Sequence, residues 1–136
     1  MLAALVRRFH EAKAADRADA AVTLWGSGTP RREFLYADDL ADAVAFVLGL
    51  SQGRLRAAAP DRLLNVGVGE DLPISELATL VRDVVGSESE VRWDASKPDG
   101  TPRKLLDVSR MAGFGWRATT PLRADVDRTY RWYLAA

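Results

Sequence analysis

The segment 96–104, with the sequence SKPDGTPRK, restricts the fold of this chain more than any other stretch. Two prolines and one glycine within nine residues exclude a helix or a central strand, so the segment must be a loop. Each proline fixes its own φ angle and favours extended backbone at the residue before it, Lys97 or Thr101. The loop is therefore stiff, and its charged side chains sit on a pre-set backbone that suits an anionic ligand. An ordinary solvated turn is the alternative interpretation.

The composition limits the kinds of partner and site. The chain has 136 residues, of which 48% are hydrophobic, and this predicts one domain with a hydrophobic core. Nineteen basic and nineteen acidic residues cancel, so neither a nucleic acid nor a membrane is an expected partner. The absence of cysteine excludes disulfides and fits a cytoplasmic location. The single histidine, His10, excludes a histidine-rich metal site and is assigned no chemistry.

Apolar residues recur at helical spacing in several segments, which predicts helices over 2–15, 39–50, 74–85 and 121–133. Asp38 is the expected N-cap of the second helix, and Gly86 is expected to stop the third. Thr120 is the expected N-cap of the last helix, with Pro121 at its first position. No capping residue precedes the first helix, as is expected if the sequence begins inside a helix.

Short apolar runs lie between the predicted helices, and we expect extended structure at 20–24, 34–36, 63–66 and 91–93. The alternation of strands and helices predicts an α/β or α+β class. The run 51–61, which contains Gly53 and Pro60, is expected to be a linker. A wholly apolar strand such as 63–66 is typical of a parallel sheet covered on both faces, and this chain offers it few neighbours. Part of the surface is therefore expected to pack on something outside the chain.

Two motifs that would place a cofactor or catalysis on this chain are incomplete. Gly67 and Gly69 follow a strand-like run as in a dinucleotide-binding turn, but Leu72 stands in the place of the third glycine and Asp71 adds negative charge. A plain glycine turn is the better interpretation. A tyrosine followed four residues later by a lysine, the proton-transfer pair of short-chain dehydrogenases, is absent. We therefore assign no catalytic residue and no cofactor site to this chain.

The loop 25–34, WGSGTPRREF, has the same character as the loop 96–104. Trp25 follows a strand-like run, two glycines allow tight backbone, and Arg31 and Arg32 are adjacent. This set places a flat apolar ring beside guanidinium donors, which suits a base or ribose next to a diphosphate. A core position for Trp25, with both arginines solvated, fits the composition equally well.

A resemblance to a known family rests on the segments 5–11 (LVRRFHE), 25–35, 65–69 (NVGVG) and, above all, 94–107 (DASKPDGTPRKLLD). They closely resemble the GDP-L-fucose synthases, extended short-chain dehydrogenases that act on GDP-4-keto-6-deoxymannose. The likeness continues to 129–134 (TYRWYL) and covers only the C-terminal part of the family.

The resemblance implies an α/β fold, namely the C-terminal substrate-binding lobe of an extended short-chain dehydrogenase of Rossmann type. In that family the N-terminal nucleotide-binding half carries the NADP turn, the Tyr and Lys of hydride transfer, and the Cys and His of epimerisation. This chain is expected to lack that half and to bind no NADP alone. Residues 1–136 would form a single lobe, with 38–69 packed on the missing Rossmann sheet. An N-terminal half, or a homo-oligomer, is the expected protein partner.

The resemblance also assigns the substrate-binding positions of a GDP-sugar site, which are Arg8, Trp25, Arg32 and Asp99, with Lys104 as a neighbouring candidate. By their chemistry, the cations would neutralise the diphosphate and Trp25 would pack on the nucleotide or sugar. Asp99 would accept a hydrogen bond from a hydroxyl or a base N–H.

Three functions stay open on the sequence. The leading one is a part of a GDP-L-fucose synthase that is catalytic only when complemented. The second is a stand-alone sugar-nucleotide binding module, which would bind GDP by itself. The third is a non-functional fragment of a related nucleotide-sugar epimerase or dehydratase, which would be poorly soluble and would not be stabilised by ligand.

Overall fold

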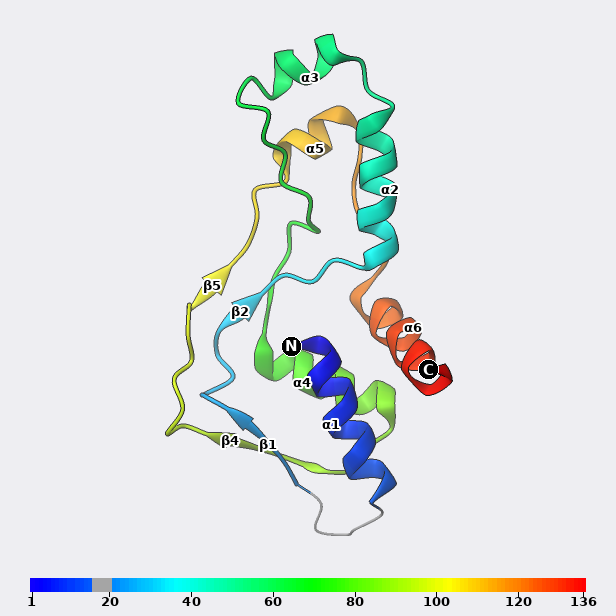
Figure 1. Cartoon of the computed structure of the whole chain (residues 1–136). Helices are drawn as coiled ribbons and strands as arrows, with labels where there is room; N and C mark the ends of the chain where they lie inside the picture. Colours follow the sequence, from blue (N-terminus) through cyan, green and yellow to red (C-terminus); the bar gives the residue numbers. More distant parts are fainter. Residues whose placement is uncertain (16–20) are drawn as a thin grey trace. The chain divides into compact units, whose positions relative to one another are not determined.

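The computed structural model describes residues 1–15 and 21–136 (Figure 1). Contacts within the chain divide it into two compact units. Unit 1 comprises 1–32, 72–103 and 123–136, and unit 2 comprises 33–71 and 104–122. Helices and short strands alternate along the sequence, which confirms the predicted α/β class.

Unit 2 is built from α2 (Ala37–Leu48), α3 (Gln52–Ala58) and α5 (Ser109–Phe114). Its core contains Ala43 of α2, Met111 of α5 and Trp116, all buried. Partly buried apolar side chains pack against this core, namely Leu35, Phe46, Val47, Leu64, Val66 and Ala118. The sequence analysis did not predict α5, because six residues are too few to show a clear apolar period.

The start of α2 differs from the prediction. Tyr36, with extended backbone, occupies the N-cap position, so the prediction that Asp38 caps this helix was wrong. The next residue, Asp39, is buried and accepts hydrogen bonds from the backbone N–H of Thr120 at 2.9 Å and from its hydroxyl at 2.9 Å. Thr120 therefore binds Asp39 through both its backbone N–H and its hydroxyl. The last helix begins at Leu122, one residue after the predicted first position, Pro121. Burial raises the pKa of Asp39, but the hydrogen bonds of Thr120 and Thr119 together outweigh this effect and lower the pKa of the carboxyl.

The predicted linker 51–61 contains α3, so that prediction was wrong as well. The Ser51 hydroxyl accepts a hydrogen bond at 3.4 Å from the backbone N–H of Arg54, which satisfies one of the unpaired donors at the helix start. The guanidinium of Arg54 lies 5.9 Å from the ring centroid of Phe114 on α5. A side-chain cap and a tertiary contact thus support a helix that the apolar pattern alone does not indicate.

The run 63–66 is not a strand, contrary to the prediction. Leu63 is 61% exposed, and no strand within the described residues pairs with this run. A strand exists only as part of a hydrogen-bonded ladder, so an apolar run without a neighbour stays irregular. The Asn65 side chain donates to the carbonyl of Asp107 at 3.1 Å and ties the run to the segment before α5.

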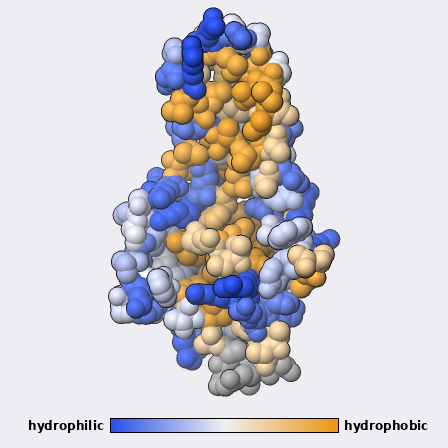
Figure 2. All heavy atoms as spheres, in the orientation of Figure 1, coloured by the Kyte–Doolittle hydropathy of each residue, from blue (hydrophilic) through white to orange (hydrophobic). Residues whose placement is uncertain are grey.

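Unit 2 has an apolar face that its own side chains leave exposed. Leu40, Val44 and Leu48 of α2 are 45%, 52% and 81% exposed. A groove with a volume of about 650 Å³ lies beside them, and Val44, Leu48, Leu55, Leu63 and Leu64 are among its lining residues. Figure 2 shows hydrophobic side chains gathered on this part of the molecule. The apolar face predicted for α2 is therefore present, and only Ala43 on it is fully buried.

Unit 1 contains three helices within the described residues: α1 (Leu2–Ala14), α4 (Ile74–Val85) and α6 (Leu122–Ala135). Each buries an apolar stripe, made of Leu5, Val6 and Phe9 on α1, Leu77, Ala78, Val81 and Val85 on α4, and Val126 and Tyr130 on α6. The predicted helices 2–15 and 74–85 are thus confirmed, since their apolar period is long and regular. The Nδ1 atom of His10 on α1 lies within hydrogen-bond distance, 3.1 Å, of the hydroxyl oxygen of Tyr130 on α6.

Two paired strands of unit 1 determine where the loops that follow them begin. In Figure 1, β1 (Ala21–Trp25) and β4 (Glu90–Asp94) lie side by side, and their register is parallel, with Trp25 opposite Asp94. Val22 and Leu24 are buried, while Thr23 and Trp25 face solvent, as the period of a strand requires. Ala20, included in the predicted strand 20–24, lies outside the described residues.

A second, small sheet has the order β3-β2-β5. Its strands are β2 (Arg31–Arg32), β3 (Leu72–Pro73) and β5 (Arg103–Lys104), and β2 pairs antiparallel with β3. The strand β5 falls at the end of the segment 96–104, which was predicted to be wholly loop. The extended run predicted at 34–36 has no strand.

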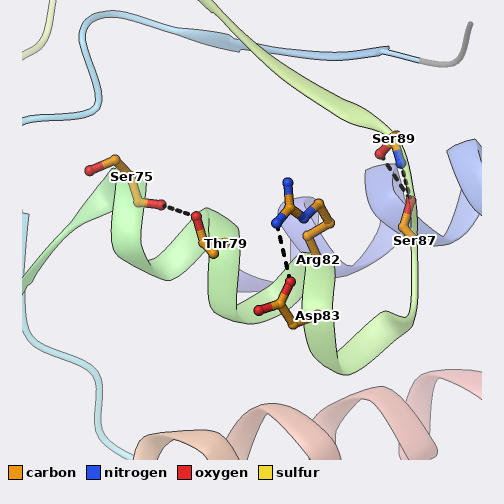
Figure 3. A network of polar contacts seen from close by, with 6 residues as sticks. All are labelled: Ser75, Thr79, Arg82, Asp83, Ser87 and Ser89. Carbon is orange, nitrogen blue, oxygen red and sulfur yellow. Dashed lines mark hydrogen bonds and ion pairs between the residues drawn. The ribbon is translucent and has the colours of Figure 1, made fainter.

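The end of α4 leads directly into β4. Gly86 adopts a left-handed conformation, with φ of 69°, as expected for a residue that stops a helix. The backbone N–H of Ser87 then donates to the carbonyl of Arg82 at 3.1 Å. The hydroxyls of Ser87 and Ser89 lie 2.9 Å apart, and both serines are buried. Figure 3 shows this pair just beyond the end of the helix. The prediction that Gly86 ends this helix is confirmed.

We expect Asp39→Asn to lower the free energy of unfolding by about 1–3 kcal/mol, because an amide NH₂ would face one of the two Thr120 donors. The folded-state pKa of Asp39 lies below its ordinary value of 3.8. Its contribution is therefore fully present above that value and is lost as the pH falls through the lower folded-state pKa. The variant should lose less stability on acidification than the wild type.

Urea denaturation at neutral and at acid pH, followed by circular dichroism, measures both effects. Asp38→Asn is the matched control, because Asp38 is exposed in the same first turn of α2. Equal stabilities of the two variants at neutral pH would contradict the role given to the Thr120 bonds.

Candidate functional site

Four of the predicted binding residues, Arg8, Trp25, Arg32 and Asp99, lie in unit 1. Trp25 ends β1, Arg32 ends β2, and Asp99 belongs to the loop between β4 and β5. The fifth candidate, Lys104, belongs to unit 2, where it is exposed at the end of β5. The site is therefore described from the residues of unit 1.

The two cationic loops are joined by one pair of residues, Ser27 and Asp99. The Asp99 carboxylate accepts a hydrogen bond from the backbone N–H of Ser27 at 2.6 Å and from its hydroxyl at 2.8 Å. These two bonds, the backbone N–H first, lower the pKa of Asp99 below its ordinary value. Asp99 is thus ionised at neutral pH. The loop 25–32 and the loop 95–102 therefore meet, although their residues are far apart in sequence.

Glycine is needed at two positions of the first loop. Gly26 has a φ of +81° and Gly28 a φ of +76°, a region that other residues rarely adopt. A Cβ added at Gly26 would collide with the Asp99 carboxylate, and one added at Gly28 would meet the indole of Trp93. The two glycines therefore permit the close approach of the loops as well as the turn.

Trp25 lies on the surface, where its side chain is 68% exposed. The alternative that placed it in the core was therefore wrong, because the strand period turns Trp25 to the solvent and Leu24 inward. The ammonium of Lys97 lies 5.7 Å from the centroid of the Trp25 ring. A cation at this distance over an indole is attracted by the ring quadrupole.

Arg8 and Arg32 each donate one hydrogen bond to a nearby backbone carbonyl. Arg8 is exposed, and its guanidinium donates to the carbonyl of Thr23 in β1 at 3.0 Å. Arg32 is half-buried, and its guanidinium donates to the carbonyl of Arg31 at 2.7 Å. A guanidinium has five N–H donors, so each contact orients the group and leaves further donors for an anion.

The glycine turn at 67–69 holds a carboxylate. Glu33 accepts from the backbone N–H of Gly69 at 2.6 Å and from that of Leu106 at 3.0 Å. A Cβ added at Gly67 would collide with the same carboxylate. The turn therefore surrounds a negative group of the chain itself, which is the opposite of a cradle for a pyrophosphate. This geometry favours the interpretation of a structural turn.

Sequence reasoning missed Ser27, Lys97 and Glu33 as residues that shape these loops. Ser27 stands between two glycines and Glu33 follows two arginines, which are weak signals on their own. Within the described residues, no helix is long and apolar enough to cross a membrane. No cluster of three metal-binding side chains occurs in the same part of the chain.

Comparison with known proteins identifies the family. The profile of the NAD dependent epimerase/dehydratase family matches residues 1–67. The probable GDP-L-fucose synthase 1 of Oryza sativa subsp. japonica is 48% identical over 98% of this chain. The GDP-L-fucose synthase of Escherichia coli (strain K12) is also 48% identical over 98% of it. The chain belongs to the NAD-dependent epimerase/dehydratase family.

A solved member of this family has the same fold. The GDP-mannoheptose C4 reductase of Campylobacter jejuni, determined with NADP bound, matches 98% of this chain with a TM-score of 0.82 and 32% identity. The chain spans 38% of the rice protein, 42% of the E. coli synthase and 44% of the reductase. It thus corresponds to a C-terminal part of the epimerase/dehydratase family, which confirms the resemblance noted in the sequence.

We expect Asp99→Ala to loosen the loop 25–32, because both oxygens that hold Ser27 are removed. The loss of one hydrogen bond corresponds to about 1 kcal/mol, so the Ser27 amide should exchange with solvent about fivefold faster. Hydrogen exchange followed by ¹H–¹⁵N spectroscopy measures this change. Asp127→Ala on α6 is the control, because it removes a carboxylate of unit 1 that pairs with Arg131. Unchanged exchange at Ser27 in Asp99→Ala would show that the two loops do not depend on this contact.

Proposed function

We propose that this chain is the GDP-sugar-binding part of an NADP-dependent GDP-L-fucose synthase, which converts GDP-4-keto-6-deoxymannose to GDP-L-fucose. The 48% identity to GDP-L-fucose synthases over 98% of the chain supports this proposal most strongly. The geometry agrees with it, because the loop of Trp25 and the loop of Asp99 meet and place aromatic, cationic and carboxylate groups in unit 1.

Each candidate residue has a role that its contacts permit. The guanidinium groups of Arg8 and Arg32 bind the diphosphate with the donors that their backbone contacts leave. Trp25 offers an exposed indole for the base or the sugar ring. Asp99 is ionised and keeps acceptor capacity beyond its bonds to Ser27, so it can accept from a hydroxyl or a base N–H.

The hydride and proton transfers belong to the part of the relatives that this chain does not span. None of its three tyrosines is followed four residues later by a lysine, and it has no cysteine. The residues present do not fit a cofactor phosphate at the glycine turn 67–69, because the Glu33 carboxylate occupies the space beside Gly67 and Gly69. This chain therefore contributes binding and orientation of the sugar nucleotide, and we derive no cofactor step from it.

The exposed apolar face of unit 2 is the surface on which the remaining part of the enzyme would pack. Leu40, Val44 and Leu48 follow one another at four-residue spacing on α2, and Val44 and Leu48 line a groove together with residues of the irregular apolar run 63–66. An unpaired apolar run and an uncovered helix face are both satisfied if 38–69 joins a sheet supplied by the nucleotide-binding half. The activity is then expected only in a complex with that half.

The complex can be tested by mixing this chain with the portion of the E. coli synthase that it does not match. We expect oxidation of NADPH in the presence of GDP-4-keto-6-deoxymannose, measured by the loss of nicotinamide absorbance. Val44→Glu should abolish this activity, because it places a charge in the apolar contact. Thr79→Glu is the control, because it places the same charge on the exposed surface of α4. Equal activity of Val44→Glu and Thr79→Glu would contradict the packing of α2 on the partner.

We expect Arg32→Ala to weaken GDP binding by the same complex about tenfold, because a charge-assisted hydrogen bond to phosphate is lost. Isothermal titration calorimetry with GDP measures the affinity. Arg7→Ala is the control, since Arg7 is an exposed cation of α1 that pairs with Glu11. Unchanged affinity in Arg32→Ala would refute its assignment to the diphosphate. Tight GDP binding by the chain alone, without any activity in the complex, would favour the stand-alone binding module.

A further inference from the structure

Lys97 was not among the residues assigned to the substrate site, yet it lies against one of them. Its Nζ atom is 5.7 Å from the centroid of the Trp25 ring. Lys97 is exposed, and it forms no ion pair within the described part of the chain. Its charge is therefore available to an anionic ligand that reaches Trp25.

The backbone fixes Lys97 beside Trp25. The carbonyl of Asp94 accepts hydrogen bonds from the N–H of Gly26 at 3.0 Å and from the N–H of Lys97 at 3.1 Å. Gly26 directly follows Trp25, so this carbonyl binds Lys97 itself and the residue next to Trp25. Pro98 further restricts the backbone of Lys97 to extended geometry. The lysine stem can move, but its point of attachment is set.

The carboxylates nearest to Lys97 in sequence form no ion pair with it. Both oxygens of Asp99 are bonded to Ser27, and Oδ1 of Asp94 accepts from the backbone N–H of Ser96 at 3.0 Å and from its hydroxyl at 2.5 Å. The turn thus satisfies its acids with neutral donors and keeps the lysine unpaired. Such an arrangement leaves a positive charge on a stiff loop next to an exposed aromatic ring.

A cation over an exposed indole is held weakly, whereas a charge-assisted hydrogen bond to a phosphate oxygen is stronger. The ammonium sits on a flexible four-carbon stem, so it can exchange one partner for the other without moving the backbone. Resting on the proposed function, we propose that Lys97 binds the diphosphate of the GDP-sugar. Its ammonium moves from the Trp25 ring to a phosphate oxygen, and the ring face is left to the base or the sugar.

The test is a titration, with GDP and with guanosine, of this chain in complex with the portion of the E. coli synthase that it does not match. The indole N–H signals of this chain are followed in ¹H–¹⁵N spectra, where Trp25→Phe assigns the Trp25 signal. Lys97→Met keeps the length of the stem and removes the charge. We expect it to weaken GDP binding about tenfold and to leave guanosine binding unchanged, because only GDP carries the phosphates. Lys97→Arg should restore most of the GDP affinity. Arg123→Met, an exposed cation of α6, should bind both ligands as the wild type does.

Four other outcomes are possible, and each bears on a different part of the proposal. Equal GDP affinities of the wild type and Lys97→Met would remove Lys97 from the site and leave the proposed function intact. An equal loss for guanosine would show that Lys97 acts by packing on Trp25 and not through phosphate. Binding of UDP as tight as that of GDP, with the same dependence on Lys97, would support the diphosphate contact and count against the GDP-sugar. No binding of GDP by the wild type would overturn both the role of Lys97 and the GDP-sugar site of this chain.

Discussion

The parallel pairing of β1 with β4 is the contact on which the candidate site depends. It sets Trp25 opposite Asp94. The carbonyl of Asp94 then accepts hydrogen bonds from the N–H of Gly26 in one loop and from the N–H of Lys97 in the other. After the last pair of this ladder, the hydrogen bonds between Ser27 and Asp99 join the two loops that follow the strands. Two loops that belong to distant parts of the sequence are thereby brought together by one short ladder and one carboxylate.

Unit 2 is held in a different way, through carboxylates that accept hydrogen bonds from distant donors. Asp39 accepts from Thr120, Glu33 accepts from Gly69 and Leu106, and Asp61 pairs with Arg110. The Arg110 side chain lowers the pKa of Asp61. Burial raises the pKa of Asp39, but the hydrogen bonds of Thr120 and Thr119 together lower it. These contacts fix irregular backbone that has no ladder of its own, and their strength depends on the acids staying ionised.

The two units therefore carry complementary features of the proposed function. Unit 1 carries a cationic and aromatic surface built on a strand pair, which suits the recognition of a nucleotide diphosphate. Unit 2 carries an apolar groove and an unpaired apolar run, which suit packing on a further sheet. Within this chain four of the five candidate binding residues lie in unit 1, and the uncovered apolar face lies in unit 2. This separation allows ligand binding and complementation to be tested by different substitutions.

The sequence by itself determined α1, α4 and their buried faces, the glycine that ends α4, and the strand β4, because each follows from a local period or a single backbone preference. It also carried the family, since the residues around Asp99 are distinctive. Only the tertiary structure decided that Trp25 is exposed, that Ser27 binds Asp99, that Thr120 serves Asp39, and that 63–66 is not a strand. The physical reason is that these features depend on hydrogen-bond partners 42 to 81 residues away or on the lack of a neighbouring strand. A local pattern specifies which groups need partners, and only the folded chain specifies which partners they find.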